Sequence, residues 1–428
     1  MAKSADYKPS AKGVSRIFAG DKVMWIVIIV LLVFSLYLVY STTAYDAATN
    51  ANQELIKQIL FICIGMTGFY VMQMIPIKWY RKLTRPFFFV FLMLTVVMIF
   101  THDGKDAARA LQITESISFQ PFEFLKFAVI FNLASQLSSR QKQMDKLQII
   151  PSFRISQWRE HRQEQLDILM NQTLPIILPI AISCLVTLIV SNSTTLIIAS
   201  SCFAMMYLSR VQIKDLGKIL AVGVVVASLA LVIYGSEASR RDTLISRFKA
   251  WTPNMITKSA KVGVVDKLEY YSRKGNEHDQ TIYAKMSIAT GEIKGKGAGR
   301  STNRYLAEAD KDMAYAFLIE EYGLIGGVII LFAFLLIFYR SMVIFQKCGA
   351  AFPGLLVLGI GTVIVLQAFM HMLVSVSLFP LTGQQLPIIS KGGTSLILTL
   401  SMLGVLMGVS ARAEQEEAER ESKRAGNK

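Results

Sequence analysis

The sequence predicts an all-α integral membrane protein with about ten membrane-spanning helices and a large loop between the seventh and the eighth. Two features of the composition predict this class. Hydrophobic residues make up 53% of the 428 positions, and only 18% are charged, whereas soluble domains carry about a quarter charged residues. The third observation is a series of apolar runs, such as 23–40 and 216–235. These runs approach the roughly 20 residues that cross a bilayer core about 30 Å thick.

Ten apolar segments follow one another along the chain and are expected to be the spans. Their expected bounds are 22–42, 55–75, 86–101, 119–138, 173–190, 194–209, 216–235, 314–340, 353–379 and 391–411. The third and sixth are short, and the ninth is long enough to tilt or break. The first exceeds the apolar core of a signal peptide and no small-residue cleavage site follows it, so we expect it to remain as a membrane anchor.

Basic residues in the connecting segments predict the orientation, because Lys and Arg in short loops concentrate on the cytoplasmic side. The basic segments are the N-terminal tail 1–21, the loop 78–85, the segment 140–162 and the loop that holds Arg210 and Lys214. If ten helices alternate, these four segments share one side, so we expect both termini in the cytoplasm. The segment 140–167 also mixes charged and apolar residues, as an interfacial helix on the inner leaflet would.

Residues 1–21 and 412–428 are therefore expected to be charged cytoplasmic tails around a membrane domain, 22–411. The net charge of +15 reflects this topology, and no nucleic acid partner is expected. A long basic segment, about 236–313, falls outside the cytoplasm by the helix count. Loops beyond roughly 60 residues translocate largely regardless of charge. Its Lys and Arg residues predict an anionic partner.

A glycine-rich stretch within that loop, 288–300, is a candidate for contact with phosphate. Its glycines let the backbone approach a ligand, and Lys294, Lys296 and Arg300 supply positive charge. A flexible exposed linker has the same composition, so that alternative stays open.

The cysteines and histidines indicate no metal site. Four of each are scattered along the chain without metal-ligand spacing, and the cysteines are interpreted as packing residues. The absence of a Gly-x-x-x-x-Gly-Lys-Ser/Thr loop argues against an ATP-driven pump. The sequence contains no strong internal repeat, so it gives little support to a transporter built from inverted halves. The sequence specifies no cofactor, and a divalent cation at the site stays an open alternative.

Charged residues at the border of the fourth and eighth spans are candidates for chemistry. A charge at mid-bilayer costs on the order of 3 kcal/mol, so charged residues in or beside a span are usually paired or functional. Glu123 and Lys126 lie three apart on one helical face and can pair, either as a structural link between helices or as part of a charged pocket. Asp312 is the last acidic residue before the eighth span. Its position suits a general base, and a solvated helix start is the alternative. Glu320 and Glu321 lie about two turns deeper and are expected to hold this helix against its neighbours.

A break in the apolar pattern near the C-terminus predicts a cavity. The residues that interrupt or restart the helix are Pro380, Gly383, Pro387, Gly392 and Gly393. Irregular backbone at membrane depth persists only where it is buried in protein or lines a cavity. We therefore expect a cavity that opens toward the outer leaflet.

These motifs together resemble the SEDS family, the polytopic proteins of bacterial shape, elongation, division and sporulation. SFQPFEFLKF (118–127) resembles the family's FQPSE-x-x-K, and IATGEIKGKGAG (288–299) resembles its GKGLG loop. AEADKDMAYAFLIEEYGLIG (307–326) resembles PE-x-H-TDFIFA-x-x-EE-x-GL-x-G. LFPLTGQQLPIISKGGTS (378–395) resembles LLPVTG-x-PLPF-x-SYGGSS. The four motifs keep the family order over nearly the whole chain.

The resemblance implies a glycosyltransferase that polymerises lipid II, the undecaprenyl-diphosphate-linked disaccharide pentapeptide, and releases undecaprenyl diphosphate. Asp312 aligns with the family's essential aspartate and is expected to be the base. Glu123 and Lys126 align with the Glu and Lys of QPSE-x-x-K. The cations expected around the substrate diphosphate are Lys126, Lys294, Lys296, Arg300 and Arg109, and Lys391 joins the expected substrate-binding residues.

The basic N-terminal extension and the first span resemble the division branch of the family more than the elongation branch. That branch implies a bacterial inner-membrane protein at the division septum. Its implied partners are the nascent glycan strand, a class B penicillin-binding transpeptidase and other division proteins. Two rival functions stay open, a lipid II flippase or other transporter and a non-catalytic division scaffold.

Several residues depart from the family pattern. SNSTT (191–195) stands where the family usually has Gln-Pro-Asp-x-Gly-Thr, and the usual Trp beside Arg109 is absent. Phe122 replaces the Ser of QPSE, and Lys391 replaces the Tyr of SYGG. Asp310 replaces a His two residues before Asp312. This extra negative charge either strengthens proton binding by the base or requires a nearby cation, for which Lys311 is the closest in sequence.

Overall fold

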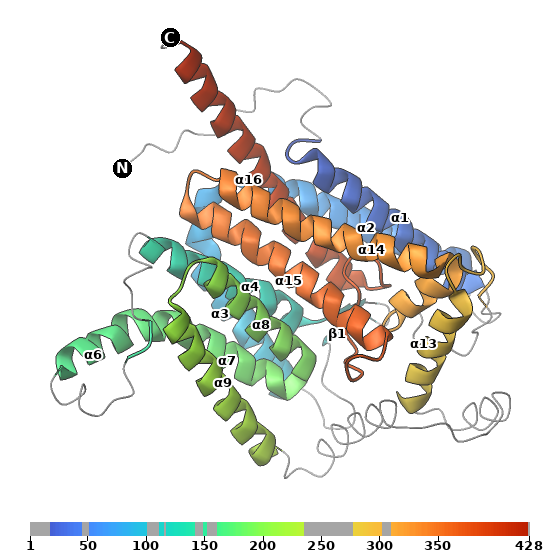
Figure 1. Cartoon of the computed structure of the whole chain (residues 1–428), viewed down its shortest axis with the longest axis horizontal. Helices are drawn as coiled ribbons and strands as arrows, with labels where there is room; N and C mark the ends of the chain where they lie inside the picture. The colour runs from blue at the N-terminus through green and yellow to red at the C-terminus, as the bar shows by residue number, and fades with distance from the viewer. Residues whose placement is uncertain are drawn as a thin grey trace.

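The computed structural model describes residues 18–44, 51–100, 111–114, 117–141, 149–151, 161–234, 277–301 and 310–426. Figure 1 shows the helices packed side by side as a bundle. Among the described residues, seven helices are long and apolar enough to cross a membrane by length and composition. The predicted class, an α-helical polytopic membrane protein, is confirmed, and the count of ten spans stays a prediction.

Most helices follow the predicted apolar runs, but two of them, 162–168 and 277–291, lie outside these runs, and the second lies within the stretch 236–313 that was expected to be a loop. The helices are α1 (Lys22–Ala44), α2 (Ala51–Met74), α3 (Ile77–Phe100), α4 (Pro121–Arg140), α6 (Arg162–Ile168), α7 (Leu174–Val190), α8 (Asn192–Leu208), α9 (Ile213–Tyr234), α13 (Glu277–Gly291), α14 (Ala314–Lys347), α15 (Ala351–Ser375) and α16 (Gly393–Gly426). A π-helical turn, Leu169–Thr173, joins α6 to α7 into one long apolar segment. One short antiparallel hairpin, β1 (Leu111–Thr114) and β2 (Ile117–Phe119), leads into α4.

One predicted loop is wrong. Residues 78–85 were expected to connect two spans, but they form the first turns of α3, which begins directly after Pro76 at Ile77. Lys and Arg are good helix formers, so the basic run extends the apolar helix instead of ending it. The C-terminal charged segment is likewise a helical extension, because α16 continues to Gly426.

Contacts between helix ends define two ends of the bundle. At one end, which we call the terminal end, the backbone N–H of Asp21 donates to Ser410 Oγ at 3.1 Å. The Asp21 carboxylate pairs there with Arg340 of α14. At the opposite end α2 begins near the loop that precedes α16, where Glu54 Oε2 lies 3.1 Å from Lys391 Nζ. The start of α14 lies at this second end, which we call the cavity end.

The most buried of the candidate membrane spans are α15 and α16. In an apolar 18-residue window of each, 78% of the residues are buried, against 17% for α2, so α15 and α16 contact protein while much of α2 is left for lipid. Helix α16 packs against α2 through small residues. An added Cβ at Gly404 would meet the backbone of Phe69, and one at Gly408 would meet the backbone of Gln73. Small residues at such positions let two membrane helices approach closely.

Candidate functional site

The predicted ion pair in α4 forms and is buried. Pro121 occupies the first turn of the helix, where its missing N–H costs nothing. Lys126 Nζ lies 2.7 Å from Glu123 Oε2 and donates to Gln367 Oε1 of α15 at 2.6 Å. Lys126 is only 1% exposed and Glu123 is 6% exposed. The Lys126 ammonium group is therefore more deeply buried than the Glu123 carboxylate, and it links α4 to α15.

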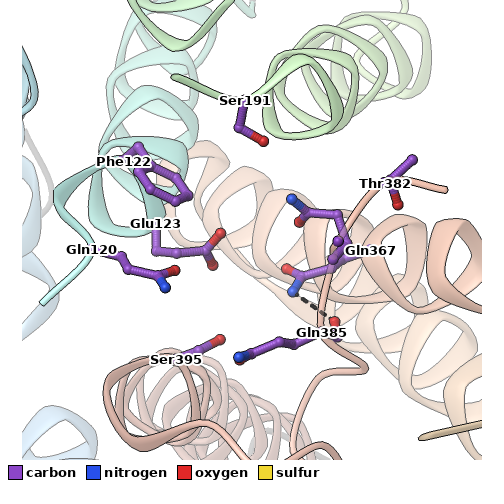
Figure 2. Close-up of a pocket in the computed structure, with 10 residues that line it drawn as sticks. Gln120, Phe122, Glu123, Ser191, Gln367, Thr382, Gln385 and Ser395 are labelled. Carbon is purple, nitrogen blue, oxygen red and sulfur yellow. Dashed lines mark hydrogen bonds between the residues drawn. The ribbon is translucent and has the colours of Figure 1, made fainter. Parts of the chain in front are cut away.

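A cavity lies beside this pair at the cavity end of the bundle, with an empty volume of about 440 Å³ that includes open space. Figure 2 shows Gln120 and Glu123 on the left of it, Gln367 and Gln385 facing them on the right, and Ser191 at the top. The lining residues are Gln120, Phe122, Glu123, Ser191, Gln367, Thr382, Gly383, Gln384, Gln385 and Ser395. Amides and hydroxyls dominate this lining, so it suits a ligand rich in hydroxyl and amide groups.

The loop 376–392 between α15 and α16 forms one wall of the cavity, as the predicted helix break implied. Gly383 has φ 65°, a conformation that favours glycine. The loop is fixed to α15 because Gln367 Nε2 donates to the carbonyl oxygen of Gln385 at 3.1 Å. The helix breakers Pro380 and Pro387 fall in the same loop. Gly392 and Gly393 mark the start of α16, where an added Cβ would meet Gln385 and Phe61 respectively.

A line of polar contacts runs through the cavity wall. His371 Nδ1 lies 2.7 Å from the carbonyl oxygen of Gln384. Gln384 Nε2 in turn donates to Ser193 Oγ and Thr194 Oγ1, each at 3.2 Å. On the other ring nitrogen, His371 Nε2 accepts from the N–H of Tyr315 at 3.4 Å. The Nε2 acceptor places the proton on Nδ1, and this tautomer joins α8, α14, α15 and the loop.

The acidic turn before α14, residues 310–313, is attached to the same loop. The N–H of Lys391 donates to the carbonyl oxygen of Asp310 at 2.7 Å, and Ser390 Oγ donates to that of Lys311 at 2.8 Å. Lys391 Nζ also lies 3.1 Å from Asp310 Oδ2. Burial lowers the pKa of Lys391, but the carboxylates of Asp310 and Glu54 raise it more, so the net shift is upward. Asp312 is half-buried between this anchored backbone and α14.

The glycine-rich loop, 291–301, contacts α14 at a break in that helix. Gly323 has φ 70° and ψ −174°, so it is not helical. The break leaves the Glu320 and Glu321 carbonyl oxygens to accept from the N–H groups of Lys296 and Gly297, each at 3.0 Å. The loop and the interrupted helix thereby satisfy each other's backbone groups.

Glu320 and Glu321 lie at this junction, and both are almost fully buried. Glu320 accepts from Lys296 Nζ at 2.5 Å and from Ser301 Oγ at 2.7 Å. Glu321 accepts from Ser41 Oγ of α1 at 2.6 Å and from the N–H of Gly299 at 3.1 Å. The two carboxylates thus connect α14 to the loop and to α1.

Replacing Gly323 by Ala is expected to destabilise the protein by about 1–3 kcal/mol, because φ 70° is strained for a residue with a Cβ. The added Cβ would also meet the carbonyl oxygen of Ile293. Denaturant unfolding of the purified chain in mixed micelles measures the change. Gly217→Ala in α9 is the matched control, since nothing lies within 4 Å of its added Cβ. Equal stability of the two variants would contradict the assigned strain.

The structure brings some of the predicted site residues together and separates others. Glu123 and Gly383 line the cavity, and the loop 376–392 that holds Gly383 is hydrogen-bonded to the acidic turn, whose Asp312 is not among the described residues that line the cavity. Lys296 lies at the α14 break, and Lys294 and Arg300 are exposed on the same loop; none of the three is among the described residues that line the cavity. Arg109 falls outside the described residues.

Sequence reasoning missed most of the polar residues that line the cavity, among them Gln367, Gln384 and Gln385, and also His371, which contacts the carbonyl oxygen of Gln384. The available signal was the presence of an amide and an imidazole inside an apolar span, where polar groups are costly and usually functional. Among the described residues, no group of three His, Cys, Asp or Glu side chains could hold a metal ion.

Comparison with known proteins gives consistent matches. The sequence profile for FtsW, RodA and SpoVE, described as "Cell cycle protein", matches residues 21–415. A Bacillus subtilis (strain 168) protein named "Probable peptidoglycan glycosyltransferase FtsW" is 26% identical over 96% of this chain and 91% of its own length. "Stage V sporulation protein E" of the same strain is 25% identical over 91% of this chain and 96% of its own length.

Solved structures share the fold. A chain from "Structural coordination of polymerization and crosslinking by a peptidoglycan synthase complex" has a TM-score of 0.64 at 18% identity. The match covers 92% of this chain and 98% of that one. Rod shape determining protein RodA of Thermus thermophilus has a TM-score of 0.56 at 17% identity, with 92% and 97% covered. At such identities the similarity supports the arrangement of the helices.

Proposed function

Because the chain belongs to the FtsW/RodA/SpoVE family of cell cycle proteins, we propose that it is a peptidoglycan glycosyltransferase that polymerises lipid II into glycan strands. One observation carries the proposal beyond family membership. The acidic turn that holds Asp312 is hydrogen-bonded to the loop that walls an amide-rich cavity, through Lys391 and Ser390. A carboxylate able to accept a proton and a cavity suited to sugars therefore belong to one structural unit.

In the proposed reaction, the hydroxyl oxygen of the acceptor sugar forms a bond to the anomeric carbon of the donor. The bond from that carbon to the diphosphate breaks, and undecaprenyl diphosphate leaves with the electron pair. Asp312 accepts the proton of the hydroxyl group. A diphosphate leaves as a stable anion that cations can stabilise, so one carboxylate is enough. Glycoside hydrolysis usually needs a second carboxyl to protonate a poorer leaving group.

The cavity lining suits the sugar part of the substrate. Gln120, Gln385 and Ser395 present amide and hydroxyl groups that match sugar hydroxyls and acetamido groups. Lys126 was expected at the diphosphate, but it is buried behind Glu123. Its proposed role is to position the Glu123 carboxylate. Lys294 and Arg300 are exposed and stay our candidates for diphosphate contact.

The proposed orientation has both termini in the cytoplasm and the cavity at the outer side of the inner membrane. The contacts of Asp21 with Ser410 and Arg340 support it, because they bring the residue before α1 beside α16 at the end of the bundle opposite the start of α14. The family supports a place at the division septum. A class B penicillin-binding transpeptidase is the proposed partner, since the structural neighbour comes from a polymerising and crosslinking complex.

The test is reconstitution of the full chain with its transpeptidase partner in liposomes that contain labelled lipid II. Polymerised glycan separated by gel electrophoresis is the expected product. Translocation of lipid II without polymer would favour the flippase alternative, and neither polymer nor translocation would favour the scaffold. A parallel sample with EDTA tests the open question of a divalent cation, because activity that is lost there and restored by Mg²⁺ would place a cation in the reaction.

A further inference from the structure

Two residues that depart from the family motifs contact each other at the cavity end. By the resemblance described under Sequence analysis, Asp310 stands where the family motif has His, and Lys391 stands where it has Tyr. Lys391 Nζ lies 3.1 Å from Asp310 Oδ2, and the N–H of Lys391 donates to the Asp310 carbonyl oxygen at 2.7 Å. The extra negative charge and the extra positive charge therefore form one ion pair, two residues from Asp312.

We propose that Lys391 is a positioning residue for the reaction, which offsets the charge of Asp310 and holds the acidic turn so that Asp312 can accept the substrate proton. The inference rests on the proposed function and deepens it. Holding the turn and offsetting the charge depend on different atoms. The backbone N–H of Lys391 and the hydroxyl of Ser390 hold the turn, whereas the Lys391 ammonium group supplies the charge.

The surrounding charges support this role for the ammonium group. From α2, Glu54 Oε2 lies 3.1 Å from Lys391 Nζ, and Lys57 Nζ lies 2.8 Å from Glu54 Oε1. The acidic turn itself carries the charged residues Asp310, Lys311 and Asp312. The titratable group on α15 is His371, whose ring accepts a hydrogen bond from the N–H of Tyr315 at the start of α14.

Glu54 thus has a lysine partner on α2 as well as Lys391. Lys391 is half-buried, at 30% side-chain exposure, so its charge is screened less than a fully exposed one. Removal of the ammonium group should leave more negative charge on the acidic turn.

The test is the pH profile of lipid II polymerisation by the full chain with its transpeptidase partner, measured for single and double variants. Lys391→Met keeps the backbone hydrogen bond and removes the charge. It should move the acid-side midpoint of the profile up by about 0.5–1 pH unit, because the unbalanced Asp310 favours protonation of the base. Asp310→Asn should move the midpoint down by a similar amount. The double variant should return to within about 0.3 pH unit of the native midpoint.

Lys391→Arg is the conservative variant and should keep the native midpoint, and unfolding curves check that each variant folds. A merely structural role of Lys391 would lower the rate without moving the midpoints in opposite directions. Unmoved midpoints, or shifts of the same sign in both single variants, would overturn the inference if Asp312→Asn is inactive in the same assay. A native chain without polymerase activity, or an active Asp312→Asn variant, would instead overturn the proposed function.

Discussion

Replacing Asp312 by Asn is expected to lower the rate of lipid II polymerisation by roughly 10²–10⁴-fold, the range that removal of a general base usually gives. Asparagine has nearly the same shape and keeps a hydrogen-bonding oxygen, but it cannot accept the proton of the acceptor hydroxyl. The contacts of Lys391 and Ser390 with the backbone of the acidic turn use the carbonyl oxygens of Asp310 and Lys311, and they stay in place in the variant. The fold should therefore survive the change.

Polymer formed per unit time by the purified chain with its transpeptidase partner measures this effect. Asp167→Asn is the matched control, because Asp167 is exposed on α6, away from the residues that line the cavity. The control should polymerise at the native rate, and both variants should unfold at the native denaturant midpoint. Native activity in Asp312→Asn would remove the residue from the catalytic role.

Replacing Lys126 by Met should destabilise the protein by about 3–5 kcal/mol, the usual cost of leaving one member of a buried ion pair without its partner. Lys126 is 1% exposed and is held by both Glu123 and Gln367. The variant leaves the Glu123 carboxylate in a site from which its countercharge has been removed. Denaturant unfolding in mixed micelles gives the free energy directly.

Two further variants separate this effect from general damage. Glu123→Leu together with Lys126→Met removes both charges, and it should recover most of the lost stability. Lys347→Met breaks the exposed pair with Glu417, so its expected cost is only about 0–1 kcal/mol. A Lys126→Met variant as stable as Lys347→Met would show that the α4 pair contributes little.

The helices could be predicted from the sequence because membrane spans are recognised by the length and hydropathy of their apolar runs. The runs that became α1, α2 and α14 start within a few residues of the expected bounds. The start of α3 was missed because the charges of Lys and Arg in 78–85 are typical of a loop between spans. The same residues have a high helix propensity, and they form the first turns of α3. Local composition cannot decide between these two outcomes, which depend on where the membrane surface meets the helix.

The site was predictable only in part, because its contacts join segments far apart in the chain. The pairing of Glu123 with Lys126 followed from helical spacing. The pairing of Asp310 with Lys391 did not, and closeness in sequence suggested Lys311 instead. His371 gave no spacing pattern, since its partners come from Gln384 and from the backbone of α14. Such contacts become visible only once the loop 376–392 is placed against the acidic turn.

We propose above that this chain forms glycosidic bonds at the cavity end with Asp312 as the base. The most direct test counts both products, the polymer bonds formed and the undecaprenyl diphosphate released, for the native chain and for Asp312→Asn beside the same partner. The native chain should release one diphosphate lipid for each disaccharide added, and the variant should give neither product above background. Equal polymer from both chains, or release without polymer, would contradict it.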